Sequence, residues 1–134
     1  FNSYASPTPV IEEGRVYVSF GTYGNACLDT KTAAPIWKNT DLKLDHKEGP
    51  GSSPVQYKNF FILHCDGMDV QYVVALDKHT GKVKWKTNRG FPADQAYTTP
   101  LVIPPFITRS HSSNFAGGCL TPAARSSFND SPIT

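Results

Sequence analysis

The feature that most constrains the fold of this chain is an internal repeat. The segment from Asp29 to Trp37 recurs from Asp77 to Trp85, and the matching residues lie 48 positions apart without a gap. A second pattern, Ser or Thr followed by Pro and an apolar residue, recurs with spacings of 45 and 46 residues, at Thr8, Ser53 and Thr99. Two independent motifs with nearly the same period predict a repeat architecture in which each copy is one supersecondary unit.

Each copy of the repeat predicts four short strands. The second strand of each copy is rich in β-branched and aromatic residues, which fit a pleated surface. In the first copy we expect strands at 10–11 and 15–20, a third ending at Leu28 and a fourth carrying Trp37. In the second copy the corresponding expectations are 55–57 and 60–65, a strand ending at Leu76 and one carrying Trp85. The chain is therefore expected to be all-β.

The Asp-x-x-Thr-Gly segment predicts a tight hairpin between the third and fourth strands. Asp77 can accept backbone N–H groups that follow it, Thr80 can do so more weakly, and Gly81 adopts positive φ without steric cost. Asp29 has the same role in the first copy, where Ala33 replaces the glycine. A left-handed conformation at Ala33 costs about 1–2 kcal/mol, so the first hairpin should be the weaker one.

One tryptophan per copy predicts how the copies are held together. Trp37 and Trp85 each follow the hairpin turn and can lay the indole against a neighbouring sheet. Burying such a ring removes roughly 150–250 Å² from water, a gross gain of about 4–6 kcal/mol at about 25 cal/mol per Å². We expect these two residues to be the anchors between stacked sheets.

The residues from Ala75 to Trp85 carry a resemblance to a known family. Their pattern, Ala-Leu-Asp-x-x-Thr-Gly-x-x-x-Trp, resembles the repeat of pyrroloquinoline-quinone-like (quinoprotein-type) β-propellers, and 27–37 is a degraded copy. In that family the motif's tryptophan docks one four-stranded blade onto the next. The resemblance implies a partial β-propeller, with blades at 1–48 and 49–96, the first strand of a third blade at 97–103 and an irregular or disordered tail at 104–134.

The resemblance suggests functions without selecting one, because the superfamily includes quinone-dependent dehydrogenases, an outer-membrane assembly lipoprotein and many secreted proteins. The run 49–55, together with 64–67, is most similar to the secreted branch. We expect a non-catalytic binding or scaffolding module, periplasmic or secreted, with a protein or polysaccharide ligand. A closed propeller needs at least four blades, so the missing blades or copies of the same chain are expected partners. The alternatives are a fragment of a quinone-dependent dehydrogenase and a truncated or frame-shifted, non-functional fragment.

The sequence offers one candidate ligand loop, formed by Asp66, Asp69 and Gln71, because propeller loops on one rim commonly bind ligands. Alternation along a strand sends His64 and Cys65 to opposite faces, which argues against a shared metal ion. No catalytic, cofactor-binding or metal-ligating residue is therefore expected in this chain. The quinone cofactor and calcium enter only through the family analogy. The segment 45–48 is interpreted as a solvated connection between blades.

Composition excludes two further classes of function. The 134 residues are 39% hydrophobic and 18% charged, and the net charge of +2 provides no basic field for nucleic acid. The longest apolar runs are far shorter than the roughly 18 residues of a membrane span. Three cysteines without a CxxC pair are expected to be small buried side chains, and the start at Phe1 is expected to be internal to a longer precursor.

Overall fold

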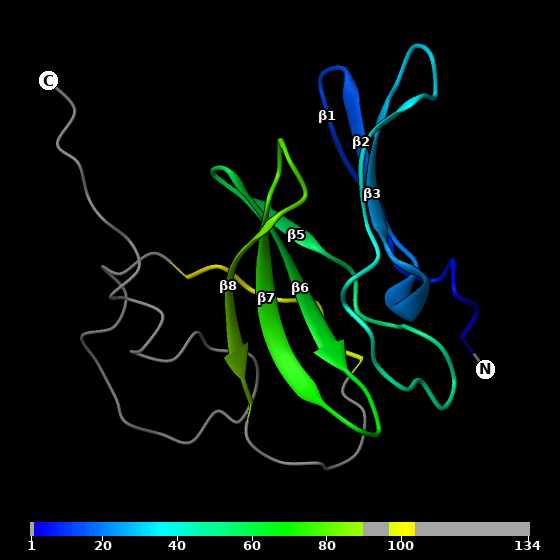
Figure 1. The fold of residues 1–134 in the computed structure, drawn as a ribbon, viewed down its shortest axis with the longest axis vertical. Helices are drawn as coiled ribbons and strands as arrows, with labels where there is room; N and C mark the ends of the chain where they lie inside the picture. Colours follow the sequence, from blue (N-terminus) through cyan, green and yellow to red (C-terminus); the bar gives the residue numbers. More distant parts are fainter. Residues whose placement is uncertain (1, 90–96, 104–134) are drawn as a thin grey trace, which may run out of the picture. The chain divides into compact units, whose positions relative to one another are not determined.

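The structure, a computed structural model, describes residues 2–89 and 97–103, and within them the strands form two four-stranded antiparallel sheets (Figure 1). The first sheet contains β1 (Val10–Glu12), β2 (Arg15–Ser19), β3 (Asn25–Asp29) and β4 (Pro35–Asn39). The second contains β5 (Val55–Tyr57), β6 (Phe60–Asp66), β7 (Gln71–Asp77) and β8 (Val83–Asn88). A 3-10 helix, η1 (Gly21–Tyr23), joins β2 to β3. The prediction of an all-β fold built from four-stranded repeats is confirmed.

The two hairpins that follow β3 and β7 have the same hydrogen bonds. Asp77 Oδ1 accepts the backbone N–H of the second and third residues after it at 2.9 and 3.0 Å, and Asp29 Oδ1 does so at 2.9 and 2.8 Å. In both turns the fourth residue donates its N–H to the aspartate carbonyl at 2.8 Å. That fourth residue has positive φ in each case, +70° at Gly81 and +58° at Ala33. The aspartate therefore organises the turn as the sequence predicts.

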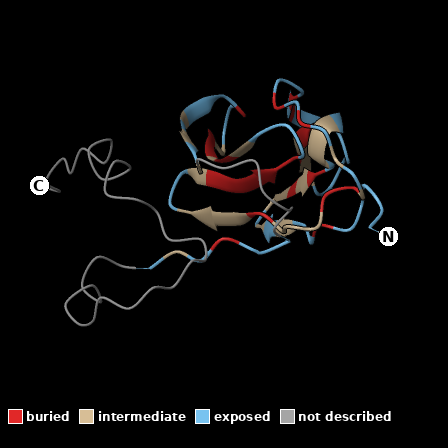
Figure 2. Ribbon diagram, turned by 90° about the horizontal axis from the view of Figure 1, so that it is seen from below, coloured by how far each residue is buried: buried red, intermediate tan, exposed pale blue. Residues whose placement is uncertain are grey.

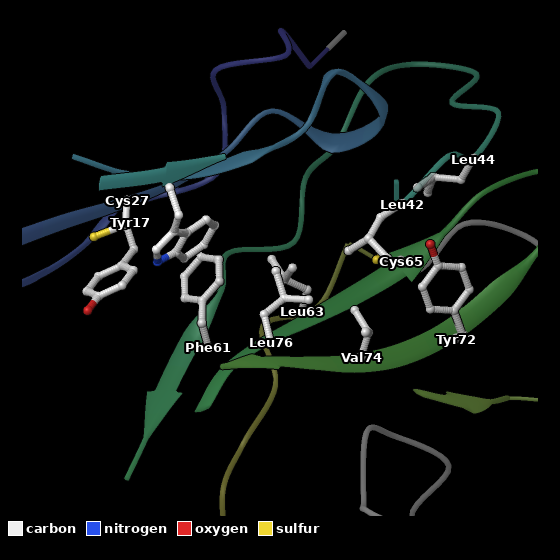
Figure 3. Packing of buried hydrophobic residues seen from close by; sticks show 11 residues of the cluster. Tyr17, Cys27, Leu42, Leu44, Phe61, Leu63, Cys65, Tyr72, Val74 and Leu76 are labelled. Atoms are coloured by element: carbon white, nitrogen blue, oxygen red, sulfur yellow. The ribbon is translucent and has the colours of Figure 1, made fainter. Parts of the chain in front are cut away.

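The faces of the two sheets that meet form one apolar core, and buried residues lie along the strands and in part of the connection between the sheets (Figure 2). On the first sheet Tyr17 pairs with Cys27 across β2 and β3, and Trp37 continues the row on β4. The Phe61 ring of β6 stacks on Tyr17 with centroids 5.5 Å apart and meets Trp37 edge-on at 6.3 Å. The remainder of β6 and β7 contributes a second group of side chains to this core (Figure 3): Leu63, Cys65, Tyr72, Val74 and Leu76.

Trp37 joins the first sheet to the hairpin of the second. Its indole Nε1–H donates to the carbonyl oxygen of Lys78 at 2.8 Å. Its ring lies directly over Gly81, where a Cβ atom would overlap the indole. Asn39 adds a bond from its side-chain amide to the Gly81 carbonyl, 2.7 Å long. Trp85, at the matching position of the second sheet, is half-buried, and its Nε1 has no hydrogen-bond partner among the described residues.

Four further expectations concern the third blade, the tail, the cysteines and a membrane span. The structure assigns residues 97–103 to no strand, and the strand that would pair with them falls in 104–134, so the third blade stays a prediction. The expected tail at 104–134, and with it the frame-shift alternative, lies outside the described residues. Cys27 and Cys65 are free and buried, as expected of small apolar side chains. Within 2–89 and 97–103 there is no helix with the length and apolarity of a membrane span.

A second link between the sheets is a polar cluster around Glu12. The Glu12 carboxylate accepts the Tyr17 hydroxyl at 2.5 Å, the Gln56 amide at 2.7 Å and the Lys78 ammonium at 2.9 Å. These bonds, that of Tyr17 above all, lower the pKa of Glu12 to about 2 despite the opposing effect of burial. Because hydrogen bonds to the charged form favour it, the cluster stabilises the fold only while Glu12 is ionised.

We expect acid to weaken the link through Glu12. The unfolded-state pKa of a glutamate is about 4.3, above the folded value of about 2. The contribution of Glu12 is therefore complete above about pH 4.3 and disappears as the pH falls through about 2. Urea unfolding measured from pH 2 to 6 should show a smaller acid-induced loss of stability in Glu12→Gln than in the wild type. Glu13→Gln, at the exposed neighbouring position, is the control, and equal pH profiles for the two variants would contradict the assignment.

The turn at Ala33 makes a second prediction. Since Ala33 has a φ of +58°, glycine relieves the left-handed strain there, and Ala33→Gly should raise stability by about 0.5–1 kcal/mol after the entropic cost of glycine. The melting temperature followed by circular dichroism should then rise by a few degrees. The reciprocal change Gly81→Ala should lower it, because the added methyl group overlaps the ring of Trp37. A neutral or lower value for Ala33→Gly would show that the turn is not strained.

Candidate functional site

Where β2 and β6 end and β3 begins, the chain encloses a cavity of about 20 Å³, which we call the rim cavity. Its walls come from both sheets and from the connection between them. The side chains that matter chemically are Ser19, Asn25, His46, His64, Asp66 and Tyr97.

The connection from β4 to β5 forms one wall of the rim cavity and is held down at two points. Leu42 and Leu44 are buried in the core beside Cys65 (Figure 3). The backbone N–H of Asp45 then donates to Asp69 Oδ1 at 2.8 Å. As a result the His46 ring packs against Gly21, where a Cβ atom would meet its Nε2. The expectation of a fully solvated 45–48 segment therefore fails at His46, which is half-buried.

Three polar atoms of the residues that line the rim cavity are shielded from solvent and have no hydrogen-bond partner among the described residues. They are Asn25 Oδ1, His46 Nε2 and Asp66 Oδ1. Asn25 is 4% exposed and Asp66 is 7% exposed. An unpaired buried polar group costs about 1–3 kcal/mol, and native structures contain few of them. Three of the five such atoms in the described residues therefore belong to residues of the rim cavity.

The charges around the rim cavity are balanced. The second oxygen of Asp66, Oδ2, pairs with Arg89 Nη1 at 2.6 Å. Burial lowers the pKa of His46, and burial together with the charge of Arg89 lowers the pKa of His64, so both imidazoles are neutral at neutral pH. The His64 Nδ1 atom lies 3.1 Å from the carbonyl oxygen of Thr98. The cavity thus offers hydrogen-bonding atoms without a net charge.

The three residues of the predicted ligand loop lie in the β6–β7 hairpin and have different partners. Asp66 belongs to β6 and lines the rim cavity. Asp69 Oδ1 accepts the N–H groups of Asp45 and Val70, a structural role that lowers its pKa. Gln71 pairs with Asp66 in the β6–β7 ladder, and its carbonyl accepts the Arg89 N–H at 3.0 Å. In the described part of the chain no three His, Cys, Asp or Glu side chains cluster to hold a metal.

The two residues that precede Asp66 point to opposite faces of β6, as alternation predicts. His64 contacts Thr98, whereas Cys65 lies in the core between the sheets. Burial raises the pKa of the Cys65 thiol to about 12. Since the thiolate is the form that attacks electrophiles and binds metals, Cys65 is chemically inert at neutral pH.

Sequence reasoning missed Asn25 and His46 as cavity residues. Each lies in or beside a connection without hydrophobic periodicity, so no pattern placed it. The available signal was four glycines, at 21, 24, 49 and 51, in the β2–β3 and β4–β5 connections. The first three have positive φ. At Gly21 a Cβ atom would overlap His46, and at Gly51 it would overlap Tyr97.

Comparisons with known proteins give a fold. No protein-family model matches the chain. No curated protein matches it. Among solved structures, a quinohemoprotein alcohol dehydrogenase from Comamonas testosteroni is similar over 60% of this chain, with 23% identity and a TM-score of 0.51. A europium-containing methanol dehydrogenase matches the same share with 19% identity and a TM-score of 0.53. A quinohemoprotein alcohol dehydrogenase from Pseudomonas putida does so with 26% identity and a TM-score of 0.51. The matches span only 12–15% of the length of those chains.

The site geometry predicts the outcome of a metal titration. Asp66 Oδ2 is paired with Arg89, Asp69 Oδ1 accepts two backbone N–H groups, and no three metal-ligating side chains cluster in the described residues, so a cation finds no set of ligands there. Calorimetric titration of the protein with Ca²⁺, Mg²⁺ or Zn²⁺ should therefore give no saturable heat, in the wild type and in Asp66→Ala alike. Saturable heat in the wild type that disappears in Asp66→Ala would show that this carboxylate binds metal.

Proposed function

We propose that this chain, which contains two blades of a quinoprotein-like β-propeller, is a non-catalytic binding or scaffolding segment of a longer protein. The observation that carries the proposal is that each blade has two apolar faces, one for each neighbouring blade. The rim cavity then supplies a place at which the assembled protein meets a ligand.

The equivalence of the faces follows from strand register. In the second blade Phe61 and Leu63 of β6 pack against the first blade. Arg15 pairs with Asp29 in the first blade, and Phe60 pairs with Asp77 at the matching place in the second. Counting along each strand from these pairs, Val16 corresponds to Phe61 and Val18 corresponds to Leu63. Val16 and Val18 are only half-buried, and beside them Ile11 is 73% exposed.

This apolar face of the first blade supports a preceding blade in the complete protein. Large exposed apolar patches mark interaction surfaces in soluble proteins. A closed propeller requires at least four blades, whereas the matched region spans 12–15% of the similar dehydrogenase chains. We therefore propose that adjoining blades, or copies of this chain where they are lacking, cover the outer faces.

The non-catalytic assignment rests on the rim cavity. The cofactor that the fold family implies is a tricyclic quinone, and pockets for small organic ligands usually measure 300–1,000 Å³. A cavity of about 20 Å³ has room for a water molecule or a single hydroxyl group. Its residues therefore do not fit the quinone, and we derive no redox step from them.

A second candidate function is a segment of a quinone-dependent dehydrogenase, with the cofactor held by other parts of the longer protein. The observation in its favour is that all three similar structures named above are alcohol or methanol dehydrogenases. The family resemblance also supports a periplasmic or secreted location for either candidate.

A titration with the cofactor tests the non-catalytic proposal for this chain. Pyrroloquinoline quinone and Ca²⁺ added to the purified chain should change neither the absorbance of the quinone nor the tryptophan fluorescence, because the rim cavity cannot admit the ring system. A spectral change that saturates at one quinone per chain would overturn the non-catalytic proposal in favour of the dehydrogenase.

Sedimentation velocity tests the proposed use of the outer face with the same protein. The wild type should associate as its concentration rises, and Ile36→Lys on the exposed face of β4 should reduce that association. Lys31→Glu, a change at an exposed position of the turn between β3 and β4, is the control. A wild type that stays monomeric at all concentrations would contradict a role for this face.

A further inference from the structure

We propose that the outer face of the first blade accepts a preceding blade whose side chain at the position equivalent to Trp37 is smaller than tryptophan. Ala33 is the residue that makes this selection. The inference rests on the proposed function, in which an adjoining blade covers this face, and it states the chemistry of that blade.

The turn between β3 and β4 (the first turn) and the turn between β7 and β8 (the second turn) present the same backbone atoms. The N–H of Thr30 reaches the turn between β1 and β2 at 3.1 Å, and the N–H of Lys78 reaches the turn between β5 and β6 at 2.9 Å. Ala33 and Gly81 each donate an N–H to the carbonyl of the turn aspartate at 2.8 Å. A neighbouring blade therefore meets Thr30 and Ala33 on the first blade where it meets Lys78 and Gly81 on the second.

The contact of the first blade with the second turn shows which groups a neighbouring blade uses. Trp37 and Asn39 each donate a side-chain N–H to a carbonyl of that turn, at 2.8 and 2.7 Å. The matching carbonyls of the first turn belong to Thr30 and Ala33, which are exposed and accept no hydrogen bond there from the described residues. The first turn therefore keeps both acceptors for a preceding blade.

The methyl group of Ala33 changes one part of this contact. The Trp37 ring lies so close to Gly81 that a Cβ atom there would overlap the indole carbons Cε3 and Cδ2. Ala33 has that Cβ atom and shares the left-handed φ, so an indole laid over the first turn in the same way would collide with it. A shorter aliphatic side chain clears the methyl group and buries it. Ala33 thus selects against one partner by a steric clash, a common source of specificity.

The remainder of the face fits another copy of the repeat. Val16 and Val18 are half-buried and lie where the second blade packs its own strand against the first. The N–H of Thr8 donates to Ser53 Oγ at 2.9 Å, and these two residues hold the same place in the repeat. The exposed Thr8 hydroxyl is therefore the matching acceptor for an N–H of a preceding blade. Both kinds of contact already join the two described blades.

The steric part of the inference is tested in the interface that the chain already has. Gly81→Ala recreates the first turn beneath Trp37, so it should lower the melting temperature through both backbone strain and overlap. Gly14→Ala is the matched control, because Gly14 has a φ of +75° and an added methyl group meets nothing within 4 Å. In the full chain Gly81→Ala should lower the melting temperature at least about twice as much as Gly14→Ala.

Trp37→Leu then separates overlap from strain. In this background the shift caused by Gly81→Ala should fall to that of Gly14→Ala, because the indole is gone and only the strain remains. Trp37→Met replaces Trp37→Leu if the latter does not fold, since methionine fills irregular spaces. The comparison of Gly81→Ala with Gly14→Ala in the wild type needs neither variant. Equal shifts for those two glycine variants in the wild type, or an unchanged Gly81→Ala shift without the indole, would overturn the inference.

The partner is tested by sequencing the gene on the 5′ side of the codon for Phe1. We expect a blade with a residue smaller than tryptophan eight positions after its turn aspartate, the spacing of Asp29 and Trp37. A tryptophan at that position refutes the selection, and the absence of a preceding blade refutes this occupant in favour of a second copy of the chain. Both results leave the non-catalytic function intact. That function fails on a stoichiometric spectral response to the quinone, so the two failures are distinguishable.

Discussion

The contact between Trp37 and the turn at Gly81 is the interaction on which the rest of the structure depends. The indole fills the space above a residue without a side chain and donates its N–H to the carbonyl of Lys78. This one residue therefore combines apolar burial with a directional bond, which sets both the distance and the orientation of the second sheet. The stacked rings of Tyr17 and Phe61 follow from that placement.

The face that the first sheet presents to the second is apolar in the middle and polar at both ends. The middle row contains Tyr17 and Trp37, and the end near the hairpins contains the Glu12 cluster. At the other end Ser19 pairs with Asn25 across the strands, and the opposing sheet supplies Asp66. Packing therefore closes the centre and leaves polar groups without hydrogen-bond partners at one edge.

Quasi-equivalence of the blades connects this local geometry to the longer protein. The face of the second blade that packs on Trp37 has its counterpart in the half-buried Val16 and Val18 of the first, so the same interface can repeat along the chain. Trp85 occupies the position of Trp37 in the second blade, where its half-buried ring is the counterpart of the Trp37 indole. In such an arrangement stability comes mainly from contacts between neighbours, and an inter-blade cavity becomes a natural place for function.

The sequence by itself determined the strands of the two sheets, the two aspartate-centred turns and the role of Trp37 as an anchor, because all of these depend on local spacing and recur with the repeat. The sequence left the left-handed conformation of Ala33 as a condition, and the structure meets it with a φ of +58°. Only the tertiary structure decided the site. Asn25, His46 and Asp66 belong to three separate segments, and none of them belongs to the repeat motif. They meet because the sheets pack face to face and because Leu42 and Leu44 draw the connection into the core, and these long-range effects leave no periodic trace in the chain.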